Sequence, residues 1–72
     1  MFSRGNMVSL KKDWKVARTL YHTNTFEDKS EAGQILPGDV AMVLCQSDLW
    51  VQIMTANSCV GWIYSQLLRK IS

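Results

Sequence analysis

The sequence predicts an all-β fold in which five to six short antiparallel strands curl into a small barrel, with one short helical turn near the C-terminus. Short apolar runs alternate with turn signals made of Gly, Pro, Asn and Asp. A chain of 72 residues with strands this short buries a core by curving its sheet. We therefore expect a single domain, with a barrel at 14–72 and an N-terminal extension at 1–13.

The first candidate strands lie on either side of a lysine-rich break. Residues 7–10 alternate between apolar and polar side chains, and they predict an added edge strand, a cover over the open end of the barrel, or an arm that orders on binding. Residues 14–21 also alternate, which favours a strand, although the spacing of Trp14, Ala17 and Tyr21 fits a short helix as well. Residues 22–34 are mostly polar and predict a loop.

The strongest strand signals follow this polar segment. A Pro37-Gly38 turn precedes an apolar run at 40–45, which predicts a strand buried on much of both faces. Turns at 46–48 and 57–58 then separate two further strands, so that three strands form an antiparallel meander. Residues 65–67 are expected to form the helical turn, and a closing strand follows it.

Composition excludes several classes of protein. The apolar fraction of 47% is too high for a disordered chain, and no run approaches the roughly 18 apolar residues of a membrane span. The first 15 residues lack the apolar region and cleavage site of an export signal, so we expect a soluble, cytoplasmic protein. His22, Cys45 and Cys59 do not have the spacing of a zinc site or of a catalytic pair. No metal, cofactor or enzymatic activity is expected.

The alternation within the strand near residue 50 predicts an aromatic surface. If 51, 53 and 55 face the core, then Trp50 and Met54 face outward, because successive side chains of a strand point to opposite faces. Exposed aromatic patches mark interaction sites. The alternatives are that the long loop or the N-terminal segment covers Trp50, and that Trp62 packs along the barrel edge. The predicted partner-binding surface consists of Tyr21, Trp50, Trp62, Tyr64 and Met54.

The order of these signals resembles an SH3-type barrel over residues 16–71. Residues 19–21 (Thr-Leu-Tyr) are similar to the Ala-Leu-Tyr opening of that family, and 37–39 (Pro-Gly-Asp) to its diverging turn. Trp50 stands where the family's third strand begins. The stretch 60–68 is especially similar to the Gly-Trp-Val stretch and terminal leucine of bacterial SH3 domains. The closest resemblance is thus to a bacterial or phage-type module.

This resemblance implies a small, non-enzymatic binding or adaptor module that docks a protein or peptide. In the family, acidic residues of the loop hold a ligand arginine, and Glu27, Asp28 and Glu31 are the candidates here. Tyr64 stands in the place of the family's proline and Leu67 in the place of its last tyrosine, so ordinary proline-rich ligands are not expected. Homo-oligomerisation is a further alternative, because the nearly neutral strands leave edges that pair readily.

The rival prediction is nucleic-acid binding by the basic N-terminal segment. The net charge of +2 is unevenly distributed, because residues 1–18 carry an excess of positive charge, with five cationic residues and one aspartate. Small β-barrels bind single strands by combining cations with stacking aromatics. The rest of the barrel carries little positive charge, which makes nucleic acid the less favoured partner. The candidate contacts are Lys11, Lys12, Trp14, Lys15 and Arg18.

Overall fold

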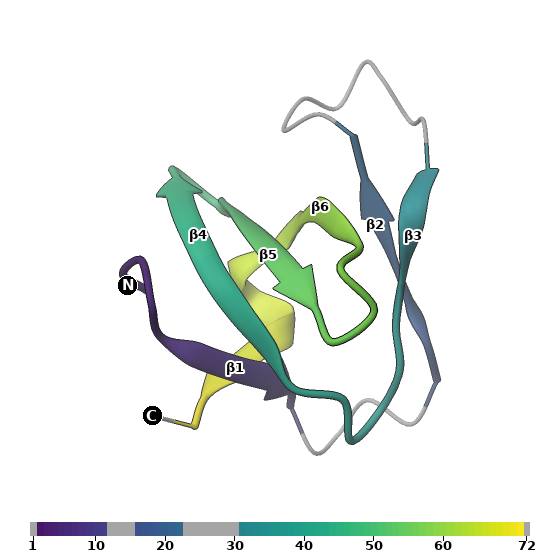
Figure 1. Cartoon of the computed structure of the whole chain (residues 1–72). Helices are drawn as coiled ribbons and strands as arrows, with labels where there is room; N and C mark the ends of the chain where they lie inside the picture. Colours follow the sequence, from purple (N-terminus) through teal and green to yellow (C-terminus); the bar gives the residue numbers. More distant parts are fainter. Residues whose placement is uncertain (1, 12–15, 23–30, 72) are drawn as a thin grey trace.

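The computed structural model describes residues 2–11, 16–22 and 31–71. This part of the chain forms one antiparallel sheet of seven strands and a single 3-10 turn (Figure 1). The all-β prediction and the helical turn are confirmed, whereas the expected number of five to six strands is wrong. The elements are β1 Met7–Leu10, β2 Arg18–Tyr21, β3 Glu31–Ile35, β4 Ala41–Ser47, β5 Trp50–Thr55, β6 Val60–Tyr64, η1 Ser65–Leu67 and β7 Leu68–Lys70.

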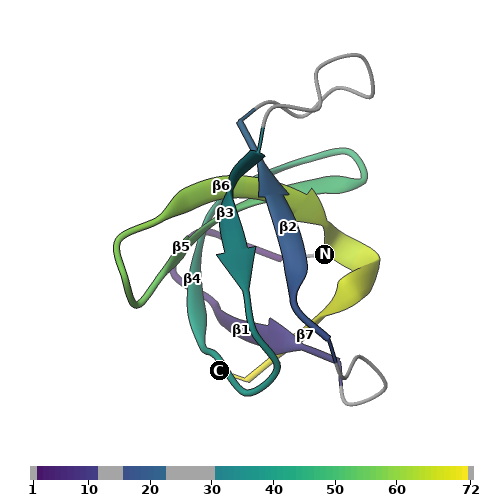
Figure 2. The ribbon, with the colours of Figure 1, turned by 90° about the vertical axis from the view of Figure 1, so that its right-hand side faces the viewer.

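The sheet curls strongly but does not close into a barrel. Its strand order is β3-β2-β6-β5-β4-β1-β7, and no register joins the outer strands β3 and β7 within the described ranges. Figure 2 shows β2 and β3 as a two-stranded ribbon that crosses in front of the other strands. Among the described residues, no helix is long and apolar enough to cross a membrane.

Every strand contributes to the core on the inner face of the curl. In β5, Val51 and Ile53 are fully buried and Thr55 is nearly so, which confirms the predicted inward face of that strand. This periodicity holds because the inner face is packed, while the described strands form no second layer over the outer face. The core residues are Val8, Leu10, Leu20, Ile35, Ala41, Val43, Val51, Ile53, Ile63 and Leu68.

The outer face of β4 differs from the sequence prediction. Ala41 and Val43 are buried, but Met42 and Leu44 are only half-buried, so the run is not covered on both faces. The register between β4 and β5 also shifts between Val43 and Cys45, which is the signature of a bulge. Continuous apolar character in this strand therefore does not mean burial on both sides.

Strand β1 lies inside the sheet rather than at its edge. It pairs with β4 through Met7 and Met42, and with β7 through Leu10 and Leu68. Val8 and Leu10 enter the core. The N-terminal run is thus an integral strand, and it is the one that joins β7 to the rest of the sheet among the described residues.

Strand β3 was not expected, because residues 22–34 predict a loop. Residues 31–35 instead pair with β2 along its length, from Tyr21 and Glu31 at one end to Arg18 and Ile35 at the other. Strand preference depends on the pairing partner more than on the residue's own propensity, which explains a strand that contains Glu, Ala, Gly and Gln. Glu27 and Asp28 lie outside the described residues.

Candidate functional site

Three aromatic side chains from three strands meet on the outer face of the sheet. Trp50 begins β5 and pairs in register with Tyr64, which ends β6. Their rings stack with centroids 4.4 Å apart and planes at 21°. The ring of Tyr21, at the end of β2, meets Trp50 edge-on, with centroids 6.2 Å apart and an interplanar angle of 89°. The predicted neighbourhood of Tyr21, Trp50 and Tyr64 is confirmed, and we call these three residues the aromatic cluster.

The prediction that Trp50 is exposed is wrong. Its side chain is only 7% exposed, although it lies apart from the inner-face core. The period of two places Trp50 on the outer face, where the rings of Tyr21 and Tyr64 lie against it. Both tyrosines are half-buried, so each keeps part of its surface accessible. Within the cluster, the tyrosines rather than the tryptophan keep accessible surface.

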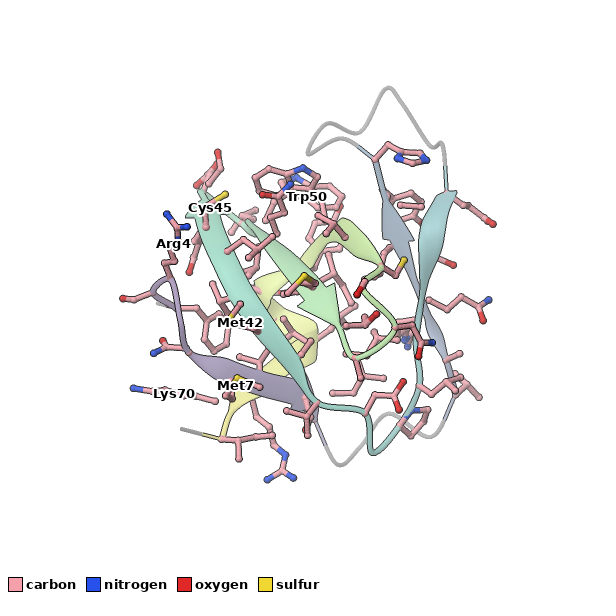
Figure 3. The ribbon with its side chains drawn as sticks, viewed as in Figure 1. Arg4, Met7, Met42, Cys45, Trp50 and Lys70 are labelled. Carbon is pink, nitrogen blue, oxygen red and sulfur yellow. The ribbon has the colours of Figure 1, made fainter. Side chains whose placement is uncertain are left out.

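Trp62 and Met54 occupy the same outer face but differ in their neighbours. Trp62 is half-buried on β6 and pairs in register with Tyr21, which extends the aromatic surface next to the cluster. Met54 pairs with Met42 of β4 and with Val60, farther along the sheet. In Figure 3, Met42 lies well below Trp50 on this face. The structure therefore brings Trp62 to the predicted site and leaves Met54 away from it.

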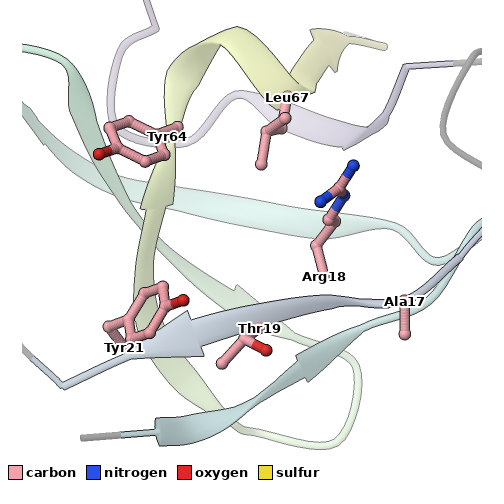
Figure 4. Close-up of a pocket in the computed structure, with 6 residues that line it drawn as sticks. All are labelled: Ala17, Arg18, Thr19, Tyr21, Tyr64 and Leu67. Carbon is pink, nitrogen blue, oxygen red and sulfur yellow. The ribbon is translucent and has the colours of Figure 1, made fainter. Parts of the chain in front are cut away.

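A cleft of about 240 Å³ opens beside the aromatic cluster (Figure 4). Among the described registers, β2 and β6 pair only at Tyr21 with Trp62, and the two strands diverge beside the cleft. The 3-10 turn η1, which follows β6 directly, borders the space between the diverging strands. The described lining residues are Ala17, Arg18, Thr19, Tyr21, Tyr64 and Leu67.

The cleft combines apolar walls with a few polar groups. The two tyrosine rings, Leu67 and Ala17 supply apolar surface, and Arg18 is the single charged residue among the six. Arg18 is half-buried, and its Nε atom is fully covered. Sites for drug-sized ligands have volumes of about 300–1,000 Å³. The present cleft is smaller than such sites.

Sequence reasoning did not assign Ala17, Thr19 or Leu67 to the partner site. A signal did exist for Leu67, because it stands where the SH3 resemblance places an aromatic ligand-contacting residue. Ala17 and Thr19 gave no such signal. They line the cleft because β2 separates from β6, which depends on the pairing of distant segments.

The residues predicted for nucleic-acid binding are only partly described. Arg18 lies in the cleft, and Lys11 is exposed, with its backbone N–H donating to the carbonyl oxygen of Leu67 at 3.0 Å. Lys12, Trp14 and Lys15 fall outside the described ranges. The hypothesis of a basic nucleic-acid surface therefore stays a prediction.

The other reactive side chains that the structure describes do not converge on a second site. Within the described part of the chain, no three His, Cys, Asp or Glu side chains are grouped so as to hold a metal ion. Cys45 and Cys59 are free thiols, and each donates to a neighbouring oxygen, that of the Gln52 side chain at 3.6 Å and that of the Ala32 backbone at 3.2 Å.

Comparisons with protein-family models, with curated proteins and with solved structures find no match for this chain.

Proposed function

We propose that this protein is a small, non-enzymatic SH3-like binding module that docks a segment of a protein partner on the cleft and the aromatic cluster beside it. The observation that carries the proposal is the position of the two tyrosines. Tyr21 and Tyr64 both line the cleft, and both rest against the buried ring of Trp50.

Trp50 makes the tyrosines suitable contact residues. Tyr64 is stacked on a ring that is itself held in place by burial, so its rotamer is restricted before any partner arrives. Immobilising a flexible side chain costs about 0.5–1.5 kcal/mol on binding, and a ring that is already fixed avoids most of this cost. Tyrosine is also enriched among the residues that dominate the energy of protein interfaces.

The strand next to the cleft supports an extended segment as the occupant. Strand β2 is paired along its length with β3, but on its other side it pairs with β6 at Tyr21 alone among the described registers. An incompletely paired strand edge accepts the backbone of an extended peptide, while a neighbouring pocket takes one of its side chains. The cleft lies on that side of β2, so both elements of this binding mode are adjacent.

Peptide selection tests the proposal directly. Random peptides displayed on phage are selected on immobilised wild-type protein, and the affinities of enriched peptides are then measured in solution. Ala17→Arg places a long side chain in the lining of the cleft, whereas Ala56→Arg makes the same change at an exposed turn outside it. We expect Ala17→Arg to weaken binding at least about tenfold, because it displaces the side chain in the cleft, and Ala56→Arg to leave it unchanged.

Two outcomes would overturn the proposal. One is the absence of any peptide enriched over selection on an unrelated β-domain. The other is equal binding of the enriched peptides by the wild type and by a folded Ala17→Arg variant.

A further inference from the structure

We infer that the protein forms a two-fold symmetric dimer, in which a second copy of this chain packs on an apolar row across the outer face of the sheet. The row includes Met54, which the sequence predicted to be a contact residue and which does not line the cleft. In order across the sheet, its members are Ile71, Met7, Met42, Met54 and Val60. We call these five residues the methionine row.

Backbone pairing places the members of the methionine row next to one another. Met42 of β4 is in register with Met7 of β1 on one side and with Met54 of β5 on the other. Met54 is in turn in register with Val60 of β6, and the backbone N–H of Ile71 donates to the carbonyl oxygen of Met7 at 2.7 Å. Figure 3 shows Met7 and Met42 side by side. Neighbouring strands lie about 4.8 Å apart, so the row is about 19 Å long.

The methionine row points away from the core and keeps accessible surface. Val8, Val43 and Ile53, each next to one of the three methionines in the sequence, are buried, and successive side chains of a strand point to opposite faces. Ile71 is 47% exposed and Val60 is 40% exposed, while the methionines between them are half-buried. Contiguous apolar surface of this kind marks an interaction site.

The charge pattern of this face indicates an uncharged occupant. Strands β4, β5 and β6 contain no charged residue, whereas about 25–35% of an ordinary soluble surface is charged. The exposed cations of β7, Arg69 and Lys70, lie at the Ile71 end, so an anionic membrane would meet no cation in the three strands that carry the rest of the row beyond β1. Interface cores are depleted in charged residues and enriched in methionine, and those of homodimers are the more apolar. The same face of a second copy has both properties.

The order of the row fits a two-fold axis at Met42. If the two rows run in opposite directions, Met42 packs on Met42 of the second copy, and Ile71 packs on Val60 of the second copy. The β7 cations of the two copies then lie at opposite ends of the dimer, whereas rows in the same direction would bring these like charges together. Methionine is unbranched and adaptable, so the three central side chains can fill the gaps between two curved faces.

The dimer leaves the cleft accessible. Val60 begins β6, whereas Tyr64, which lines the cleft, ends that strand. At about 3.3 Å per residue, the two positions are roughly 13 Å apart along β6. Dimerisation therefore goes beyond the proposed function and does not depend on it, and each dimer would present two clefts.

Sedimentation equilibrium over a range of protein concentrations tests the dimer. A row of this length belongs to a small interface, and we expect a reversible dimer with a Kd of about 10–100 µM. Met42→Lys and Met42→Asp should each weaken the dimer at least about tenfold, because like charges then meet at the axis. An equal mixture of these two variants should recover a dimer, because opposite charges meet there. Gln34→Lys adds a charge at an exposed position of β3, outside the row, and should leave the association unchanged.

A second measurement uses the wild type alone, so the test remains decisive if the Met42 variants fail to fold. Dilution of protein labelled at the methionine methyl groups should shift the NMR signals of Met42 and Met54 as the dimer dissociates. Ala17→Arg, which alters the cleft, should dimerise as the wild type does.

Three results would overturn the inference and leave the proposed function standing. The first is a wild type that stays monomeric at about ten times the expected upper Kd, roughly 1 mM. The second is a dimer that folded Met42→Lys leaves intact, or that forms without a shift of the Met42 and Met54 methyl signals. The third is a monomer that instead binds phosphatidylglycerol vesicles and loses that binding in Met42→Asp, which would assign the row to a membrane surface.

Discussion

Replacement of Trp50 by alanine is expected to unfold most of the protein rather than to remove a docking residue. Trp50 is only 7% exposed, and large aromatic side chains bury about 150–250 Å². At about 25 cal/mol per Å², burial of about 200 Å² corresponds to roughly 5 kcal/mol, which is an upper estimate because unfolded chains already bury part of that surface. The expected loss of unfolding free energy is about 3–5 kcal/mol, as for other buried Trp-to-Ala changes.

A domain of this size has a net stability of only about 3–5 kcal/mol, so the loss is comparable to the whole. Replacement of an exposed surface tryptophan would instead change the unfolding free energy by no more than about 0.5 kcal/mol. Urea denaturation followed by far-ultraviolet circular dichroism separates these cases. Trp50→Phe is the matched variant, since it keeps a ring between Tyr21 and Tyr64 and should retain most of the native signal.

The reasoning would be refuted if Trp50→Ala remained folded with a loss below about 1 kcal/mol. Trp50 would then be a replaceable surface side chain, and the tyrosines would not depend on it. If the expected unfolding is seen, lost binding by Trp50→Ala carries no information about the docking surface, and variants of the cleft lining are required instead.

Three further predictions concern the framework around the site. Gly61→Ala should destabilise the protein by about 1–3 kcal/mol, because the added Cβ would lie 2.6 Å from Cβ of Leu20, where β6 approaches β2. Thermal unfolding measures this loss, and an unchanged midpoint temperature would contradict the close approach. At Gly38, an added Cβ would meet no atom within 4 Å, but the alanine would have to adopt a φ of +91°. We therefore expect Gly38→Ala to lower the unfolding free energy by a smaller amount, about 1–2 kcal/mol, in the same assay. A stabilised variant would exclude this backbone conformation. Cys45 is exposed, whereas Cys59 is half-buried and its thiol donates to a backbone carbonyl oxygen. Thiol labelling should therefore show a fast phase, from Cys45, that the Cys45→Ser variant lacks. Equal labelling rates for both thiols would contradict this difference in exposure.

The inner face of the sheet could be predicted because the alternation of apolar and polar residues along a strand indicates which side chains face the core. Burial at Val51, Ile53 and Thr55 follows the period of two, and the helical turn expected at 65–67 is present. Strand β3 was not predictable in the same way, because Glu31–Ile35 has little strand propensity of its own. Its conformation is set by pairing with β2, which is information carried by the partner strand.

The candidate site shows the same division between local and distant information. The alternation of residues in β5 correctly predicted that Trp50 lies on the outer face. It could not predict which side chains cover Trp50 on that face. The stacking of Tyr64 follows from the β5–β6 register, and the approach of Tyr21 follows from the pairing of β2 with β6. The cleft lies between these two strands, which are far apart in the sequence, so no pattern within one segment predicts it.

The pairing of β1 with β7 has a consequence for synthesis. One of the two partners of Met7–Leu10, the strand Leu68–Lys70, is translated some sixty residues after it. At about 5–20 residues per second, the nascent chain holds the apolar side chains of β1 without that partner for several seconds. Final closure of the sheet is thereby a late event, and a chaperone that shields the emerging N-terminal segment should raise the yield of native protein.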